Sequence, residues 1–577
     1  MRRMLTTLAI LSAALVGPAC GTRHASGPPP QTATTIQVSP ATVSVLVGDV
    51  QTLSVTVSGV PDATVVWSVN GIPGGNSVVG TIEPMAGGAH YIATSIPSPD
   101  PVTVTAASQA DPSVSGSSTV TVEYPNDTAV AQAFPIRLGT SGGNVTDLTS
   151  SGGKVICCSG TLGCLVERGG VFFILSNNHV LANAGQGSVG NAITQPGLSD
   201  TNCQPGATVA SLSQAAPLPT SNVDAALAQI VPGAVDTSGS ILDLGPAGNM
   251  TIAPAPPSST PADPAGVFAA GERVAKSGRS SGLTCGSIRS IQTDVVVDYS
   301  TTCAGPTSFS VTFHNQIMVD GGTFSEAGDS GSLIVTSDSA RPVGLLYAGN
   351  SNSTVANPIA DVLAALKDPS TGAVPAIVGS ADHPVSCAPI ASIVPSKPQG
   401  VTSTAPTPLE FSRVSAAKDT LGARLLDDPA VTALGIGTSA DNPHEGALLV
   451  YVRGIPKSPL PHQLGGVRTR IVPLTEPGRA PQTQPSPERV QQAVAIKDRH
   501  SAELFGRNGV LGVGVGSSQD AEGELALVVY VDQAAGFPGV DVELEGMRTR
   551  VIEGDRFRTF GWGTPRTTSG GSCCGHR

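Results

Sequence analysis

The 577-residue sequence has few charged and few aromatic residues: Asp, Glu, Lys and Arg make up 13% of it, and Phe, Trp and Tyr make up 3%. Coiled coils and long surface helices need many more charged residues, so the composition argues against both. The net charge is −12, and no run of Lys or Arg is present. Because nucleic-acid-binding proteins carry basic patches, we expect no nucleic-acid partner.

Long apolar runs are also missing, and none is long enough to cross a bilayer as a helix. The N-terminus does combine the basic start Met1-Arg2-Arg3, a short apolar stretch at 5–16 and the small-residue site Gly17-Pro18-Ala19, which predicts an export signal over 1–19. Small residues before Cys20 resemble the bacterial lipoprotein signal, which implies a lipid on Cys20 as a membrane tether. Ordinary cleavage after Ala19 is the alternative. We expect a cell-envelope or secreted protein.

Glycine and proline are abundant, with 68 and 48 residues. This balance favours short strands and many turns. The length corresponds to two to four domains. We therefore predict a multidomain, mainly β protein.

The ten cysteines of an exported chain predict disulfides. They do not form paired C-x-x-C units, so we expect no structural zinc site, no other metal and no cofactor. The tail motif Cys573-Cys574-Gly575-His576 is either a metal ligand set or, as we favour, a frayed terminus.

The N-terminal part, residues 36–123, alternates apolar and polar residues in short stretches, as β-sandwich strands do. A polar linker at 20–35 precedes it, and a linker at 124–149 follows. The opening Val38-Ser39-Pro40, the turn Val47-Gly48-Asp49 and Trp67 together resemble bacterial Ig-like domains. This resemblance implies a spacer or a module that binds a surface ligand.

The C-terminal part contains a duplication, which begins after a linker at 386–408. Lys418-Asp419 aligns with Lys497-Asp498, and Arg468-Thr469-Arg470 aligns with Arg548-Thr549-Arg550. Each copy reads as a helix followed by two or three strands, so we predict α+β repeats at 409–475 and 488–560, with a tail at 561–577. The paired arginines either bind an acidic partner or lie on solvated strand faces.

The middle part, residues 150–385, carries the candidate chemistry. Hydrolysis through a serine needs a nucleophile, a base, a group that orients the base, and donors for the oxyanion. In Gly328-Asp329-Ser330-Gly331-Ser332, the flanking glycines allow a sharp turn. We expect Ser330 to be the nucleophile and the amides of Gly328 and Ser330 to form the oxyanion hole.

His179 follows an apolar strand and a polar turn in Phe172-Phe173-Ile174-Leu175-Ser176-Asn177-Asn178-His179, so we predict it as the base. His314 has a strand-like setting that indicates a structural role. Asp224 heads an apolar strand and is the predicted orienting carboxylate, with Asp236 and Asp243 as rivals in turn-like sequence.

The chain order His, Asp, Ser is that of the chymotrypsin family and not of subtilisins or α/β-hydrolases. The run Gly278-Arg279-Ser280-Ser281-Gly282-Leu283-Thr284-Cys285-Gly286 resembles the opening hairpin of the second barrel in bacterial trypsin-like peptidases. The run Pro342-Val343-Gly344-Leu345-Leu346-Tyr347-Ala348-Gly349 resembles their pocket strand. The resemblance implies two six-stranded β-barrels with the triad between them.

The same resemblance implies a substrate pocket at Phe324, Ala348 and Gly349. Because Phe324 stands where Arg- or Lys-cleaving members carry an aspartate, we expect cleavage after an uncharged residue, although Glu326 is a possible substitute for that aspartate. Cys285 and Cys303 flank a short strand, and we predict a disulfide between them.

These observations predict an exported serine endopeptidase of protein or peptide substrates. The alternatives are an inactive peptidase fold that serves as a surface binding or adhesion protein, and a peptidase that processes its own chain.

Overall fold

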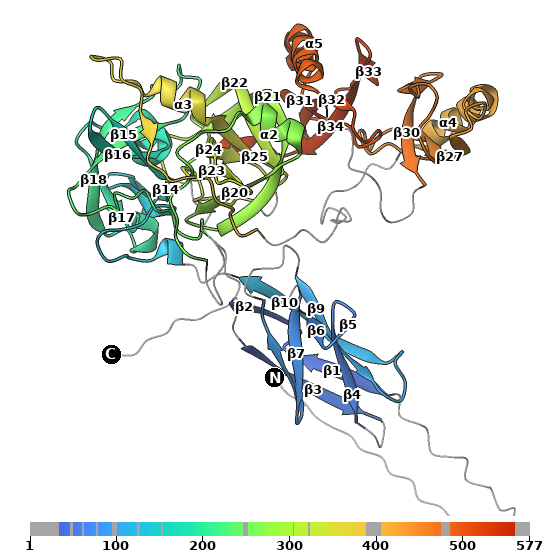
Figure 1. The fold of residues 1–577 in the computed structure, drawn as a ribbon, viewed down its shortest axis with the longest axis horizontal. Helices are drawn as coiled ribbons and strands as arrows, with labels where there is room; N and C mark the ends of the chain where they lie inside the picture. Colours follow the sequence, from blue (N-terminus) through green and yellow to red (C-terminus); the bar gives the residue numbers. More distant parts are fainter. Residues whose placement is uncertain are drawn as a thin grey trace, which may run out of the picture.

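The computed structural model describes residues 34–46, 50–59, 63–76, 79–94, 101–123, 127–151, 154–245, 252–303, 305–320, 324–387, 406–474 and 485–559. The expected export signal, Cys20, the turn at 47–49, most of the linker 386–408 and the tail from residue 560 lie outside these ranges. Within the described ranges, no helix is both long and apolar enough to span a bilayer. The chain is mainly β, as its composition predicts (Figure 1).

The N-terminal unit consists of two sheets that share one hydrophobic core, to which Leu53 and Trp67 contribute buried side chains. One five-stranded sheet has the order β1 (Thr35–Ser39), β3 (Val50–Ser58), β8 (Gly88–Ile92), β7 (Gly80–Met85), β6 (Gly75–Asn76). The other has the order β2 (Thr42–Leu46), β10 (Ser115–Glu123), β9 (Val102–Ser108), β4 (Val65–Val69), β5 (Ile72–Pro73). The period-two burial of β9 shows why alternating apolar residues form this core.

The first half of the middle domain is an eight-stranded sheet. Its order is β14 (Gly160–Leu162), β11 (Thr140–Asn144), β17 (Ala192–Gln195), β18 (Ala207–Ala215), β19 (Ala226–Ile230), β16 (Val171–Ser176), β15 (Cys164–Arg168), β26 (Ala376–Ile377). A separate hairpin joins β12 (Leu148–Ser151) to β13 (Lys154–Cys157). The short helices are η1 (Asp127–Ala129), α1 (Asn178–Leu181), η2 (Asn183–Gly185) and η3 (Leu198–Asp200).

The second half is a closed ring of six strands, because β20 pairs with β21 as well as with β23. Around the ring the strands are β20 (Arg273–Gly278), β23 (Leu333–Thr336), β24 (Pro342–Gly349), β25 (Ser353–Pro358), β22 (Phe309–Asp320) and β21 (Gly282–Tyr299). Two short helices accompany it, α2 (Pro264–Ala270) and α3 (Ile359–Ala365). Strand β20 closes the ring along Gly282–Ser287 of β21, and the remainder of β21 extends past β20.

Each C-terminal repeat consists of a helix followed by four strands. Repeat 1 contains α4 (Pro408–Leu421), η4 (Gly422–Arg424), β27 (Val431–Thr438), β28 (Gly446–Val452), β29 (Gln463–Leu464) and β30 (Val467–Pro473). Repeat 2 contains α5 (Pro487–Phe505), β31 (Val510–Ser517), β32 (Leu525–Asp532), β33 (Glu543–Leu544) and β34 (Met547–Gly554). After repeat 2 comes the short strand β35 (Phe557–Thr559).

Local sequence explains where α5 begins and which face it buries. The hydroxyl of Ser486 accepts a hydrogen bond from the N–H of Arg489, and Pro487 occupies the first turn, so the helix starts with a side-chain cap and a preset backbone. Val490, Ala493 and Ile496 are buried at three-residue spacing, which places them on the face that packs against the sheet.

The two repeats contact each other reciprocally. Arg468 of repeat 1 donates to the Thr549 carbonyl (2.7 Å), and Arg548 of repeat 2 donates to the Thr469 carbonyl (2.9 Å). Both arginines are fully buried and are also paired with glutamates of their own repeats. Both sequence interpretations are therefore wrong for Arg468 and Arg548. Neither side chain faces solvent, and neither is free to bind an acidic partner. They join the repeats, because each arginine donates hydrogen bonds to a backbone carbonyl of the other repeat.

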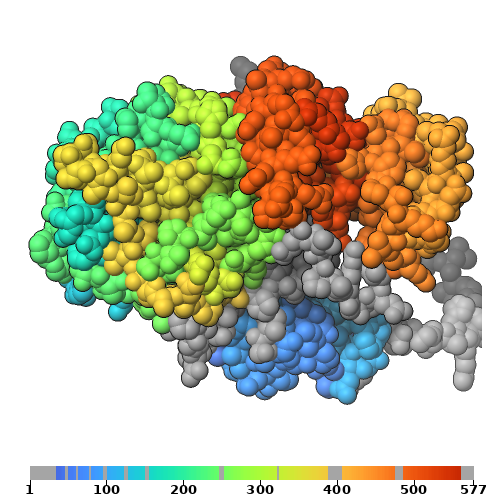
Figure 2. Space-filling view, turned by 45° about the horizontal axis from the view of Figure 1, so that its top comes forward, coloured from blue at the N-terminus to red at the C-terminus, as the bar shows by residue number. Residues whose placement is uncertain are grey.

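Repeat 2 is not a separate module, since β31 pairs with β21 and extends the sheet of the second half (Figure 1). Lys497 of α5 is buried against Asp294 of β21 at 3.1 Å, and the Tyr530 hydroxyl bonds the Ser290 hydroxyl at 2.8 Å. Figure 2 shows repeat 2 packed on the middle domain, with repeat 1 beyond it. The predicted boundary at residue 488 marks the start of repeat 2. It does not separate two sheets, because β31 of repeat 2 belongs to the same sheet as β21.

Candidate active site

His179 and Asp224 lie at the same end of a strand pair. Strand β16 ends at Ser176, β19 begins at Ala226, and these two residues are partners in the antiparallel register. The segment after β16 and the segment before β19 therefore meet. The His179 Nδ1–H donates to Asp224 Oδ2 at 2.6 Å, and the backbone N–H of His179 donates to Asp224 Oδ1 at 3.2 Å. Two bonds to one carboxylate fix both the ring orientation and the tautomer with its proton on Nδ1.

Asp224 has a further partner that the sequence did not indicate. The hydroxyl of Tyr299, the last residue of β21, donates to Asp224 Oδ2 at 2.8 Å. The side chains of both Asp224 and Tyr299 are buried. Burial, followed by the nearby Asp224 charge, raises the pKa of Tyr299 well above its usual value, so the phenol keeps its proton and acts as a donor. No local pattern marks a tyrosine at a strand end for this role.

Ser330 lies on the sharp turn that its glycines predicted. Gly328 has a φ of +104° and Gly331 a φ of +95°, a region that favours glycine. A Cβ atom at Gly331 would lie 2.3 Å from the carbonyl oxygen of Thr161, so the turn also needs the missing side chain. The N–H of Thr161 donates to the Ser330 carbonyl at 2.8 Å, which ties the turn to β14 in the first half of the domain.

The serine hydroxyl and the histidine ring are not hydrogen-bonded to each other in this structure. The Ser330 hydroxyl donates to the carbonyl of Tyr347 at 3.2 Å. His179 Nε2 is buried and has no hydrogen-bond partner among the described residues. His179, Asp224 and Ser330 are all at most 1% exposed. The structure thus brings His179 and Asp224 into direct contact and leaves the Nε2 atom available as a base.

Asp329, immediately before Ser330, forms a buried ion pair with Lys276 of β20 at 3.2 Å. Its carboxylate also accepts the backbone N–H groups of Ser280 (2.8 Å) and Glu326 (2.9 Å). Burial alone raises the pKa of Asp329, but Lys276 and these donors outweigh burial and hold the pKa below its usual value. The loop that carries Ser330 is therefore held by an internal ammonium group.

The predicted oxyanion donors lie on this loop. Within the described part of the chain, the N–H groups of Gly328 and Ser330 make no hydrogen bond to other residues. The carbonyl of Gly328 accepts a hydrogen bond from the Thr161 hydroxyl at 2.9 Å. This bond holds the peptide group that joins Gly328 to Asp329. Backbone N–H groups without a partner among the described residues can act as donors to a developing oxyanion.

The predicted pocket residues do not share one environment. Phe324 is buried in the core between the second-half ring and α2 and α5, where it packs near Gly286. Ala348 and Tyr347 belong to a different cluster, around Tyr299 and Phe313. The hydroxyl of Ser325, next to Phe324, bonds that of Thr354, which is the cross-strand partner of Gly349. Ser325 and Thr354 therefore lie beside the Gly349 end of β24.

The rival candidates lie in other contacts. His314 bonds Asp294 at 3.0 Å, and its side chain is 66% exposed. Asp236 accepts hydrogen bonds from Ser238 in an exposed turn, and Asp243 has the left-handed φ of +59° that suits a turn. The partners of the His179 ring and of the Ser330 hydroxyl are instead Asp224 and the carbonyl of Tyr347.

The predicted disulfide between Cys285 and Cys303 is wrong. The described pairs are Cys157–Cys203, Cys158–Cys303 and Cys285–Cys387. Cys285 lies near the start of β21 and Cys303 beyond its end, and a strand advances about 3.3 Å per residue, so the two sulfur atoms are far apart. The intervening residues form one long strand and not a hairpin.

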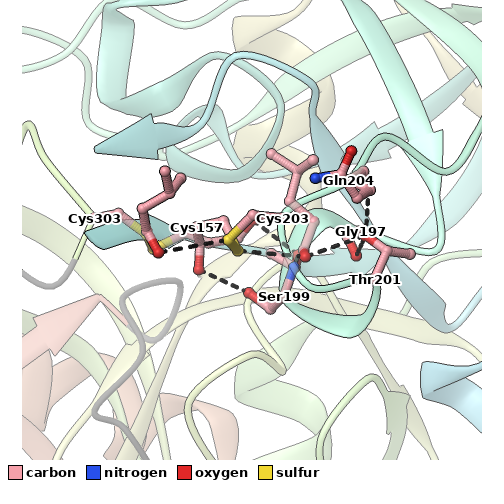
Figure 3. The surroundings of a disulfide bond; sticks show 11 residues. Cys157, Gly197, Ser199, Thr201, Cys203, Gln204 and Cys303 are labelled. Atoms are coloured by element: carbon pink, nitrogen blue, oxygen red, sulfur yellow. Dashed lines mark hydrogen bonds between the residues drawn. A yellow bond between two sulfur atoms is a disulfide. The ribbon is translucent and has the colours of Figure 1, made fainter. Parts of the chain in front are cut away.

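The observed pairing links distant parts of the middle domain. Cys158–Cys303 joins the first half to the loop after β21, and the neighbouring Cys157 is bonded to Cys203 (Figure 3). The Ser199 hydroxyl donates to the Cys157 carbonyl at 3.0 Å beside this bridge. Cys164 is buried as a free thiol, and burial raises its pKa to about 12.

Asp147 is a buried carboxyl next to this bridge. Its oxygen lies within 4.8 Å of the sulfur atoms of Cys158 and Cys303. Because the two sulfurs are bonded to each other, they do not provide thiolate ligands for a metal. Burial raises the pKa of Asp147 to about 7, against a smaller lowering by His179.

Comparison with known proteins gives limited matches. Residues 266–357, from α2 to β25, match the family described as the Nal1 C-terminal domain. No curated protein matches. Two solved structures of titin domains Z1Z2 are similar to parts of the chain, one in complex with telethonin and one functionalised with a KLER exogenous peptide from decorin. They have 13% and 15% identity, cover 36% of this chain and 86% and 87% of theirs, and have TM-scores of 0.15 and 0.13.

Proposed function

We propose that the middle domain is a trypsin-like serine endopeptidase that acts outside the cytoplasm. The observation that carries this proposal is the bonding of Asp224, which holds His179 by two hydrogen bonds, while Ser330 sits on a glycine turn in the facing half. The six-stranded ring of the second half fits the barrel that the sequence resemblance implies. The N-terminal pair of sheets fits an Ig-like spacer.

In the proposed mechanism, the Ser330 hydroxyl turns from the Tyr347 carbonyl to His179 Nε2 when a peptide binds. His179 takes the proton as Ser330 attacks the carbonyl carbon, and Asp224 stabilises the resulting imidazolium. The N–H groups of Gly328 and Ser330 stabilise the oxyanion. His179 then protonates the leaving amine, and water releases the acyl group from Ser330 by the reverse sequence.

The extracytoplasmic location is supported by three disulfides, which persist in oxidising compartments. Lipidation of Cys20 adds a membrane tether to the proposal, and proteins or peptides are the proposed substrates.

A fluorophosphonate probe tests the enzymatic function. We expect covalent labelling of the wild-type protein at Ser330 and none in Ser330→Ala. Because β35 lies close to the site, the same labelling should be done on a chain ending at Gly554, with circular dichroism as the control for folding. If both the full chain and the chain ending at Gly554 fold but neither is labelled, the proposed peptidase function is contradicted.

The bonding of the Ser330 hydroxyl to Tyr347 favours one other candidate, an inactive peptidase fold that acts as a binding protein. In that case this hydrogen bond persists when a partner binds, and the probe finds no reactive serine.

A further inference from the structure

The two C-terminal repeats differ at one strand edge. Strand β31 of repeat 2 pairs with β32 on one side and with β21 on the other. Its counterpart in repeat 1 is β27, which aligns with it residue for residue. Among the described residues, β27 pairs with β28 alone and forms the edge of a four-stranded sheet (Figure 1). The other side of β27 is therefore open to a further strand.

The exposure of the two strands reflects this difference. Every residue of β31 except Ser517 is buried, whereas Val431 is the only buried residue of β27. Ile436 of β27 is 41% exposed, and the aligned Val515 of β31 is fully buried. The same strand is thus covered in repeat 2 and uncovered in repeat 1.

A glycine in the middle of each strand is suited to close approach by a neighbour. A Cβ atom on Gly514 of β31 would lie 2.2 Å from Thr293 Oγ1, so β21 can approach only because that atom is missing. Repeat 1 has Gly435 at the aligned position, where the nearest atoms belong to Leu449 and Tyr451 of β28. A glycine inside a strand often marks a place where another backbone comes close. Repeat 1 thus keeps the feature that admits β21 in repeat 2.

A lysine on the helix of each repeat adds a preference for charge. Lys497 of α5 binds Asp498 at 2.8 Å and Asp294 of β21 at 3.1 Å, and its side chain is 4% exposed. Lys418 of α4 is the aligned residue, and within the described part of the chain its ion-pair partner is Asp419, at 2.8 Å. The Lys418 side chain is 32% exposed. Lys418 therefore makes the first of the two contacts of Lys497 and lacks the one that crosses to a neighbouring strand.

The place of the missing carboxylate follows from the register. A Cβ atom on Gly422 would lie 2.7 Å from Leu434 Cδ1 and 3.7 Å from Lys418 Cγ, so these two side chains lie together over β27. Leu434 aligns with Val513, which is the partner of Asp294 in the pairing of β31 with β21. A carboxylate opposite Leu434 would meet Lys418 as Asp294 meets the lysine of repeat 2.

We propose that the open edge of β27 binds an extended segment of another protein, which adds an antiparallel strand to the sheet of repeat 1 and carries an aspartate or glutamate opposite Leu434. Backbone hydrogen bonds along the edge supply the affinity, and the ion pair with Lys418 sets the register. The occupant is inferred from β21, the strand that covers the equivalent edge of repeat 2. The inference does not depend on the proposed peptidase function.

A fluorescent peptide with the sequence of residues 287–299, the part of β21 that faces repeat 2, is the probe. It is titrated against the full chain with its disulfides formed, and fluorescence anisotropy gives the dissociation constant. Hydrogen exchange then locates the bound peptide. We expect saturable binding, added protection of the amides of residues 431–438, and unchanged exchange at residues 510–517.

Charge variants test the ion pair. Lys418→Met should weaken binding by roughly 10-fold, because a hydrogen bond to a charged group is lost. The peptide that carries Asp294→Asn should lose a similar factor on the wild-type protein. Combining both changes should add little, since each removes the same contact. The control is Lys457→Met, which changes an exposed lysine of the same repeat and should bind like the wild type.

A second pair of variants tests the strand edge. Ile436→Asp places a carboxylate two residues from Leu434, on the strand face where the acidic residue of the peptide is expected, and should weaken binding by repulsion. Ile455→Asp makes the same change at a position of repeat 1 that is 93% exposed, and should leave binding unchanged. Circular dichroism checks that both variants fold.

Three results overturn the inference. The first is a wild-type protein that does not bind the peptide, or that binds it no better than Lys418→Met does. The second is a peptide that alters exchange at residues 510–517, because it then replaces β21 in repeat 2. The third is a dimer in sedimentation that Ile436→Asp dissociates, because a second copy of the chain then occupies the edge.

Discussion

The ammonium group of Lys276 lies 3.2 Å from the carboxylate of Asp329, and both side chains are fully buried. Asp329 directly precedes Ser330, so this pair fixes the loop that carries the nucleophile and the predicted oxyanion donors. No chain terminus takes part in the pair. If the domain is a peptidase, its loop is therefore held in place without a cleavage that creates a new N-terminus.

Replacing the lysine tests this role. Lys276→Met should destabilise the middle domain by about 3–5 kcal/mol, because it leaves the Asp329 charge buried and unpaired. In protein that remains folded, kcat should fall much more than KM changes. The double variant with Asp329→Asn should regain part of the stability but not the activity. Unchanged kcat in folded Lys276→Met would show that the pair is structural only.

The triad assignment predicts non-additive losses. Ser330→Ala and His179→Ala should each remove nearly all peptidase activity, and the double variant should lose little more than either single variant. Triad members act as a unit, and the remaining rate comes from oxyanion stabilisation and binding, roughly 10³–10⁴-fold above the reaction in water. Steady-state kinetics on a peptide substrate measures this. Losses that multiply in the double variant would contradict the assignment.

Tyr299→Phe removes one hydrogen bond from Asp224 and keeps the ring. A hydrogen bond to a charged group contributes about 1.5–3 kcal/mol, so we expect kcat/KM to fall by roughly 10-fold or more. The control is Tyr530→Phe, which removes a buried hydroxyl bonded to Ser290 in the same sheet. The control should lower the melting temperature without lowering kcat/KM. Equal activity of the two variants would exclude a role for Tyr299 at the site.

Asp147 should make stability depend on pH. Its pKa is raised to about 7 in the folded protein from the ordinary value of 3.8. As pH rises through this interval, the unfolded chain loses its proton first, so the folded state is progressively disfavoured. Asp147→Asn lacks this penalty. Its advantage over the wild type should grow from small at pH 4 to roughly 4 kcal/mol above pH 7.

Thermal unfolding of both proteins at the two pH values measures the effect of Asp147. An advantage that is the same at pH 4 and above pH 7 would mean that Asp147 is ionised in the folded protein.

Cleavage specificity is the fifth prediction. Thr354, the cross-strand partner of Gly349 at the end of β24, and Ser325, which is hydrogen-bonded to it, are both uncharged. A buried cation there would lose its hydration without gaining a carboxylate, which costs several kcal/mol. Profiling on a mixed peptide library should therefore give cleavage after small or apolar residues. Dominant cleavage after Arg or Lys would contradict the pocket assignment and point to Glu326.

Local patterns in the sequence were sufficient to predict part of the fold and part of the candidate site. Glycines around Ser330 predicted the turn with positive φ, because only glycine adopts that backbone without strain. The strand that leads to His179 and the strand that begins after Asp224 were visible as apolar runs, and composition alone predicted a mainly β chain. Self-similarity likewise located both C-terminal repeats.

The remaining features depend on contacts between residues far apart in the chain. Tyr299 reaches Asp224, Lys276 reaches Asp329, and Cys303 pairs with Cys158 only after the sheets have formed. A disulfide partner depends on which strand ends meet, and Cys285 lies near the start of the long strand β21 whereas Cys303 lies beyond its end. The placement of β35 beside β24 is of the same kind, because backbone pairing between strands carries no local sequence signal.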